Sequence, residues 1–247
     1  GCKAYSPSSE FREKALEHLP PILRGEVDLQ WEREEMESIN WNERWERHYD
    51  PMIVSDQLRL RAPFHEADPR FQREVVIEPK MSFGTGHHQT TRLMARMMVE
   101  LQWEKCQVLD MGTGTGVLAI YAEMLGAAAI DALDNFDWAV ANTEENARRN
   151  NCRHIRAELG DANALAGRRY EVILANINRN VLLQDMKHYR DCLKPGGDLL
   201  LSGFLAPDEG LIDDAARHRG LEKVKILKEE DWRCAYYRLP ESSGFSS

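Results

Sequence analysis

The sequence of 247 residues lacks the features that mark secreted, metal-stapled and membrane-spanning proteins. It has five cysteines, with no CxxC pair and no spacing typical of a zinc site, so we expect reduced thiols and no disulfide framework. No apolar run approaches the roughly 18 residues that a membrane span requires, and no basic-then-apolar leader opens the chain. These absences favour a soluble cytoplasmic protein. The cysteines are Cys2, Cys106, Cys152, Cys192 and Cys234.

Positive charge is also scarce. The chain has 32 lysine and arginine residues against 41 aspartates and glutamates, a formal net charge of −9, and no block rich in basic residues. Clustered basic side chains are the electrostatic footprint of nucleic-acid binding, so we expect no direct nucleic-acid partner. A basic protein is the kind of partner that this charge would attract.

What is present, from about residue 51 onward, is an alternation of short apolar runs with helical patterns. Such alternation indicates a parallel α/β sheet with right-handed crossovers. The last two runs have no helix between them, so we expect them to form an antiparallel hairpin at one edge. The strand-like runs are QVLDM (107–111), AAIDALD (128–134), HIRAEL (154–159), EVILANI (171–177), DLLLSGF (198–204), VKILKEE (224–230) and CAYYRL (234–239). The helical patterns are Leu93, Met97 and Leu101 four apart, the apolar run 116–125, and 181–193 before the stop signal KPGG.

The first 50 residues have a different pattern. KAYSP and VDLQWERE read as strands on either side of a helix in SSEFREKALEHL. Such a unit cannot close a core by itself, so residues 1–35 are expected to be the second half of a small α+β domain. A linker helix is expected over residues 36–50, where Trp41, Trp45 and Tyr49 share one face. This aromatic stripe is either a packing seam against the main domain or a surface that contacts the substrate.

The run DMGTGTG (110–116) follows a strand and opens a helix, the context in which a glycine loop lets a ligand approach a helix N-terminus. Its glycines, Gly112, Gly114 and Gly116, are spaced G-x-G-x-G, whereas a dinucleotide fingerprint needs G-x-G-x-x-G. Asp110 stands two residues before the first glycine. This acidic loop resembles the first motif of class I S-adenosylmethionine (SAM) methyltransferases and suits a cationic ligand better than a pyrophosphate. A structural tight turn and a nucleotide loop remain alternatives.

Three further polar residues follow strands in the order that a SAM pocket requires. Asp134 ends the second strand, where a carboxylate can accept hydrogen bonds from ribose hydroxyls; capping a helix is the alternative. Asp161 follows the third strand, either near an adenine amino group or as an ordinary loop aspartate. Asn176 ends the fourth strand, either facing the transferable methyl group or capping the next helix.

Together these stretches resemble the PrmA family, the methyltransferases of ribosomal protein L11. The stretches are FGTGHHQTT, VLDMGTGTGVLAI, ALDNFDWAV, ILANIN and KPGGDLLLSGF, and the resemblance extends upstream through NWNERWERHYDPMIV. FGTG-x-H-x-TT ahead of the first SAM motif is the discriminating element. The resemblance implies a Rossmann-like seven-stranded sheet with an antiparallel edge hairpin over residues 51–240. It also implies a ferredoxin-like N-terminal substrate domain, here partial, and residues 241–247 are expected to be a disordered tail.

The resemblance further implies methylation of lysine and N-terminal amines of L11 with SAM as methyl donor and S-adenosylhomocysteine as product. Thr91, Gly112, Asp134 and Asn176 are the expected SAM contacts by motif, and Asn176 is expected to align the amine. His88 matches the motif histidine and would accept a proton or order the loop. Departures from the family pattern include Thr113 between the first glycines, Gln89 after the motif histidine, and ANIN in place of ANIL.

Several competing functions stay open at this point. A metal site built on His87 and His88 would need a third ligand, and none is nearby in the sequence. An adenine methyltransferase of DNA or RNA usually carries an aromatic residue at the fourth strand, which ANIN lacks. A lysine methyltransferase of another protein, a SAM-binding module without catalysis, and a dehydrogenase are the remaining alternatives. We expect a monomer.

Overall fold

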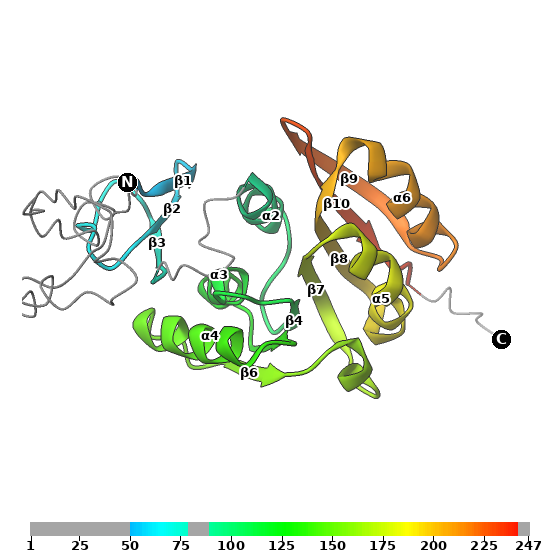
Figure 1. Cartoon of the computed structure of the whole chain (residues 1–247), viewed down its shortest axis with the longest axis horizontal. Coiled ribbons are helices and arrows are strands. Elements are labelled where there is room, and N and C mark those ends of the chain that lie inside the picture. The colour runs from blue at the N-terminus through cyan, green and yellow to red at the C-terminus, as the bar shows by residue number, and fades with distance from the viewer. Residues whose placement is uncertain (1–49, 79–88, 242–247) are drawn as a thin grey trace, which may run out of the picture. The chain divides into compact units, whose positions relative to one another are not determined.

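The computed structural model describes residues 50–78 and 89–241, which belong to one compact unit starting at Asp50. Its main sheet has seven strands in the order β6-β5-β4-β7-β8-β10-β9, and only β10 runs antiparallel to its neighbours (Figure 1). This confirms the predicted α/β fold with an antiparallel edge hairpin. The strands are β4 (Gln107–Met111), β5 (Ala129–Asp134), β6 (Ile155–Leu159), β7 (Tyr170–Asn176), β8 (Leu193–Leu205), β9 (Glu222–Glu229) and β10 (Trp232–Arg238).

Helices cover both faces of this sheet. One face carries α2 and α3, with α4 beside α3, and the other carries α5 and α6 (Figure 1). The bounds are α2 (Gln89–Met98), α3 (Val117–Leu125), α4 (Asp137–Arg149), α5 (Arg179–Cys192) and α6 (Glu209–Arg217), with short 3₁₀ turns η3 (Ala162–Leu165) and η4 (Ala206–Asp208).

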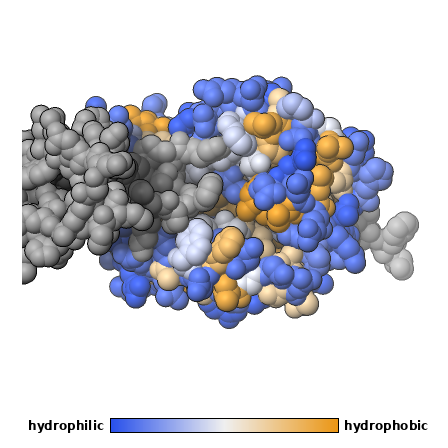
Figure 2. Space-filling model, viewed as in Figure 1, coloured by the Kyte–Doolittle hydropathy of each residue, from blue (hydrophilic) through white to orange (hydrophobic). Residues whose placement is uncertain are grey.

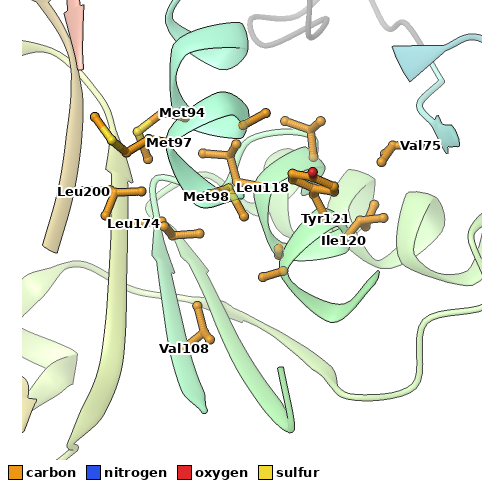
Figure 3. Packing of buried hydrophobic residues seen from close by; sticks show 14 of the residues in the cluster. Val75, Met94, Met97, Met98, Val108, Leu118, Ile120, Tyr121, Leu174 and Leu200 are labelled. Atoms are coloured by element: carbon orange, nitrogen blue, oxygen red, sulfur yellow. The ribbon is translucent and has the colours of Figure 1, made fainter. Parts of the chain in front are cut away.

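The core is divided between the two faces by the alternation of the strands. In β7, Val172 and Leu174 join the cluster under α2 and α3, whereas Ile173 and Ala175 join the cluster under α5 and α6. Successive side chains of a strand point to opposite faces, so a continuous apolar strand can serve two cores. Figure 3 shows the first cluster, in which Leu174 and Leu200 of the sheet lie near the methionines of α2.

A second, smaller sheet was not predicted. It consists of β1 (Met52–Ser55), β2 (Leu58–Arg61) and β3 (Arg73–Val76), with β2 antiparallel to β1 and parallel to β3. Its buried residues belong to the same core cluster as α2 and α3. It therefore extends that core.

Some element boundaries differ from the prediction. The helix before KPGG ends at Cys192, one residue before its predicted end, and β8 begins at once, at Leu193, five residues before the predicted strand. The early start arises because Leu193 already pairs with Tyr170 across a register shift. Leu101 lies beyond the end of α2, although it is buried in the same core as Leu93 and Met97.

Other expectations fall outside the described residues. These are the partial domain at 1–35, nearly all of the linker helix at 36–50, and the tail beyond residue 241, and they remain predictions. Within the described ranges, no helix combines the length and apolar character that crossing a membrane would need.

Candidate functional site

The glycine loop lies where β4 ends and α3 begins, at the centre of the sheet. The strand order reverses between β4 and β7, and open α/β sheets bind ligands at such a reversal, beyond the carboxyl ends of the strands. The amide groups of Gly112 and Thr113 both donate to the Leu133 carbonyl, at 2.8 and 3.0 Å. The loop is therefore fixed to the end of the neighbouring strand β5.

The three loop glycines all have left-handed backbone conformations, with φ of +73° at Gly112, +58° at Gly114 and +78° at Gly116. A Cβ atom at Gly112 would lie 2.2 Å from Cγ2 of Ile177, and one at Gly116 would lie 2.9 Å from Cγ2 of Thr143. Gly114 differs, because among residues 50–78 and 89–241, its chain neighbours aside, no atom lies within 4 Å of the place where its Cβ would be. Two glycines therefore serve packing, and Gly114 leaves its side of the loop open.

Asp134 ends β5 directly beside this open position. Its side chain is largely buried, and its Oδ2 accepts a hydrogen bond from the Gly114 amide at 3.0 Å. Its Oδ1 accepts from the Phe136 amide at 3.1 Å. A carboxylate oxygen has two acceptor positions, so each can take a further donor such as a ribose hydroxyl. The Phe136 amide lies at the N-cap of α4, and that helix end has no side-chain cap, so the capping alternative for Asp134 is not observed. The ribose contact stays a prediction.

Asp110 is fully buried beneath the loop. Its Oδ2 accepts from Oγ1 of Thr113 at 2.7 Å and from the Ala119 amide at 3.2 Å. Burial raises the pKa of Asp110 to about 6, although the two hydrogen bonds counter the shift and nearby Asp134 adds to it. In this geometry Asp110 organises the loop from within. Its contribution to cofactor binding, predicted from the sequence, would act through the loop.

Asn176 ends β7, next to the glycine-loop strand, and pairs in register with Ser202 of β8. Within residues 50–78 and 89–241 its side-chain amide makes no hydrogen bond, so its donors and acceptor are available. The cap of α5 is instead Asn178, whose side chain accepts from the Val181 amide at 3.2 Å. The capping alternative for Asn176 is therefore filled by another residue.

The residue after Asn176 is held between two glycines. Ile177 contacts Gly112, and a Cβ at Gly203 of β8 would lie 2.1 Å from the Ile177 carbonyl oxygen. Gly203 also has a positive φ of +92°. Close backbone approach on both sides thus fixes the chain where β7 leaves the sheet, and it places Asn176 beside the loop.

Asp161 caps the short η3 turn. Its two oxygens accept from the backbone amide and the side-chain amide of Asn163, at 2.9 and 3.1 Å. Both contacts belong to the loop-aspartate alternative. A contact with adenine stays a prediction.

Thr91 lies in the first turn of α2 and is 5 % exposed. The segment before it, including His87 and His88, lies outside the described residues. The function predicted for His88 therefore stays a prediction. Where the structure describes the chain, no group of three potential metal ligands occurs, and the expectation of no metal at the histidine pair likewise stays untested.

The family model described as "Ribosomal protein L11 methyltransferase (PrmA)" matches residues 2–239. The chain belongs to the PrmA family. The ribosomal protein L11 methyltransferase of Phocaeicola vulgatus is 39 % identical over 235 residues, covering 94 % of this chain and 84 % of the relative. That of Porphyromonas gingivalis is 44 % identical over 205 residues, covering 82 % and 71 %.

Solved structures agree with this membership. The ribosomal protein L11 methylase of Lactobacillus delbrueckii subsp. bulgaricus superposes with a TM-score of 0.73 at 25 % identity, covering 78 % of this chain and all of that chain. A 16S rRNA methyltransferase of T. thermophilus, solved with AdoMet and guanosine, has a TM-score of 0.52 at 18 % identity over 61 % of this chain and 43 % of that one. The latter likeness shows the fold alone. The chain is a SAM-dependent methyltransferase with the class I fold.

The PrmA site is compatible with SAM on the evidence of its own geometry. The open side of Gly114 gives room for close approach to the backbone, and Asp134 stands beside it with acceptor positions to spare. The acidic side chains near the loop also favour a cationic ligand. The observed geometry thus bears on Gly114 and Asp134, and the SAM contacts predicted for the other residues stay predictions.

The polar face of α4 was not predicted from the sequence. Thr143 donates from Oγ1 to the Gly114 carbonyl at 3.2 Å, and Asn146 donates from Nδ2 to the Thr115 carbonyl at 2.9 Å. Both side chains are completely buried. Their spacing of three residues on a helix is the signal that could have found them, because it places both on the face toward the loop.

An exposed aromatic pair also stands near the site. Phe136 and Trp138 stack with ring centroids 5.6 Å apart just after Asp134, and 53 % and 39 % of their surfaces are exposed. The face shown in Figure 2 is mostly hydrophilic over its coloured part and carries several groups of hydrophobic residues.

Proposed function

We propose that this chain methylates amino groups of ribosomal protein L11, namely lysine side chains and the N-terminal amine. Relatives 39 % and 44 % identical to it carry the name of L11 methyltransferases. The observation that carries the proposal is Asn176, whose unengaged amide stands at the carboxyl end of β7 beside the glycine loop. An acceptor there suits an amine nucleophile better than a base-stacking aromatic residue would.

The chemistry asks the protein mainly for alignment. When bound, SAM supplies an electrophilic methyl group on a sulfonium. A lysine amine has an ordinary pKa of about 10.4 and must be neutral to attack. Desolvation beside a positive charge lowers the pKa of the amine and favours its free base. Asn176 would accept an amine hydrogen through Oδ1 and orient the lone pair, so no dedicated base is required.

The remaining site residues act on the cofactor side. Gly112, Gly114 and Gly116 would present the loop backbone, and Asp134 would accept hydrogen bonds from the ribose. Asp110 would hold the loop from below. In addition, Thr91 would touch the cofactor from the start of α2, Asp161 would lie near the adenine, and His88 would order the segment ahead of Thr91.

Substrate docking is proposed for the N-terminal part. Residues 1–35 would hold L11, residues 36–50 would connect them to the methyltransferase domain, and the enzyme would act as a cytoplasmic monomer. The net charge of −9 favours a basic protein substrate over bare nucleic acid.

The test is to incubate the chain with methyl-labelled SAM and a mixture of ribosomal proteins, and to locate the label by mass spectrometry. Label on lysine or N-terminal amines of L11 supports the proposal. Label confined to other proteins would overturn the substrate assignment and favour a different lysine methyltransferase. SAM binding without any label would point to a binding module.

A further inference from the structure

A single buried amide joins two segments that are far apart in the sequence. Asn146 of α4 is completely buried, and its Nδ2 donates to the Thr115 carbonyl of the glycine loop at 2.9 Å. On its other side, Oδ1 accepts from the Glu78 amide at 3.0 Å. Nδ2 also donates to Oδ1 of Asn142 on the same helix, at 3.3 Å. The side chain therefore donates to the glycine loop and to α4, and it accepts from the strand exit after β3, here defined as residues 76–78.

The strand exit is held to α4 by further contacts. Asn150 accepts from the Val76 amide at 2.8 Å and donates to the Val76 carbonyl at 2.7 Å, as a neighbouring strand would. Arg149 pairs with Glu78 at 3.0 Å and also donates to Oδ1 of Asn146 at 3.0 Å. Residues 76–78 are thus anchored on the same helix that contacts the loop.

The anchored segment leads into the motif that distinguishes the family. Residue 78 is followed by the stretch that contains FGTGHHQTT, which ends at Thr91. The glycine loop and Thr91 are the two proposed contact regions for SAM. Among the described residues, the glycine loop and Glu78 meet at one side chain, Asn146.

We propose that Asn146 is a positioning residue that sets the glycine loop relative to residues 76–78, and that SAM affinity depends on this bridge. The inference rests on the SAM site of the proposed function. Without the Asn146 side chain, the Thr115 carbonyl would lose its hydrogen-bond donor and the glycine loop would be less fixed. SAM binding would then have to restore the geometry of the loop. A binding-competent state that is only partly populated lowers apparent affinity by that fraction.

The alternative is that Asn146 only stabilises packing of α4. Asn150 offers a matched control, because it has the same side chain one helical turn later and holds the strand exit without touching the glycine loop. The variant Asn146→Asp separates the two sides of the bridge. It keeps the acceptor for Glu78 and Arg149, loses the donor to Thr115 and Asn142, and turns a carboxylate oxygen toward the Thr115 carbonyl oxygen.

The experiment measures SAM dissociation constants by titration calorimetry on the full chain, with unfolding midpoints for each variant. We expect Asn146→Ala and Asn146→Asp to weaken SAM binding about tenfold, the fold-change that matches a buried carbonyl left without its donor. Asn150→Ala should lower the unfolding midpoint and leave SAM affinity within about twofold. The reason is that Asn150 bonds to Val76 and not to the glycine loop. In turnover assays Asn146→Asp should raise KM for SAM and leave kcat unchanged.

The outcomes separate this inference from the proposed function. If the wild-type chain binds SAM and Asn146→Asp binds it equally well, the bridge has no such function and the SAM site stands. An equal loss of affinity in Asn150→Ala would also overturn it, in favour of a packing effect. A wild-type chain that does not bind SAM would remove the site itself and this inference with it.

Discussion

The two ends of strand β7 treat their polar side chains in opposite ways. At the amino end, the Tyr170 hydroxyl donates to Asp131 at 2.7 Å, and Glu171 pairs with Lys194 and accepts from the Gln107 amide at 2.7 Å. At the carboxyl end, the side chain of Asn176 makes no hydrogen bond within the part of the chain that the structure describes. One end of the strand is occupied with internal contacts, and the other keeps a polar group available.

The same contrast extends to the neighbouring acids. Burial alone would raise the pKa of Glu171, but the hydrogen bonds from Lys194 and Gln107 leave it lowered. At the carboxyl end, burial raises the pKa of Asp110 despite its own hydrogen bonds. At the carboxyl ends of the strands, the glycine loop with its left-handed residues lies over the buried side chain of Asp110. Burying this acid lowers the stability of the folded state. Such a cost is expected at a functional site.

The largest effect should come from closing the space beside Ile177. In Gly203→Ala the new Cβ would lie 2.1 Å from the Ile177 carbonyl oxygen at a positive φ, so backbone must move. We expect the free energy of unfolding, measured with urea, to fall by about 3 kcal/mol, and methyl transfer to fall with it. Gly210→Ala in α6 is the control, because its Cβ meets no atom within 4 Å and alanine favours helix. Equal stability of the two variants would contradict this account of β8.

The next effect should separate chemistry from stability. Replacing Asn176 by alanine removes the acceptor proposed to orient the amine, and we expect the methyl-transfer rate to fall by about a hundredfold or more. The unfolding free energy should change little, since the amide has no partner to lose. SAM should still bind, which titration calorimetry would check. Full turnover in this variant would remove Asn176 from the proposed mechanism.

The fold could be read from the sequence because it depends on repeated local signals. Seven apolar runs, helical patterns between them and the DMGTGTG loop predict the sheet, its edge hairpin and the place of the site. The hydrogen bonds that organise the site could not be predicted in the same way. Whether Asp110 faces a ligand or Thr113, or whether Asn146 is solvated or bridges two segments, depends on packing between elements that are distant in sequence. Buried polar pairing has no periodic signature.

A third, smaller effect is a pH dependence at Asp110. Its folded pKa of about 6 lies above its ordinary value of 3.8, so ionisation destabilises the folded state and stability is gained as pH falls. Between pH 7.5 and pH 5 the wild-type chain should gain about 1 kcal/mol from this group. Asp110→Asn should lack that gain. The unfolding free energy of the variant relative to that of the wild type should therefore be more favourable at pH 7.5 than at pH 5. Urea unfolding at both pH values measures it, and a difference that does not change with pH would show that Asp110 titrates normally.

The smallest effect should come from the amino end of β7. There the stability contributed by an acidic side chain should fall as pH falls, whereas at Asp110 stability rises. The Glu171 and Lys194 side chains are both 36 % exposed, so solvent screens their pair. We expect Glu171→Gln to lower the unfolding free energy by about 0.5 kcal/mol at pH 7. Because the folded pKa of Glu171 is lowered, this contribution is present above its unfolded pKa and disappears as pH falls through the folded one. Methyl transfer and SAM affinity should be unchanged, since the residue lies at the strand end away from the glycine loop. A loss of activity comparable with that of Asn176→Ala would mean that both ends of β7 serve the reaction, and the contrast between them would then need another explanation.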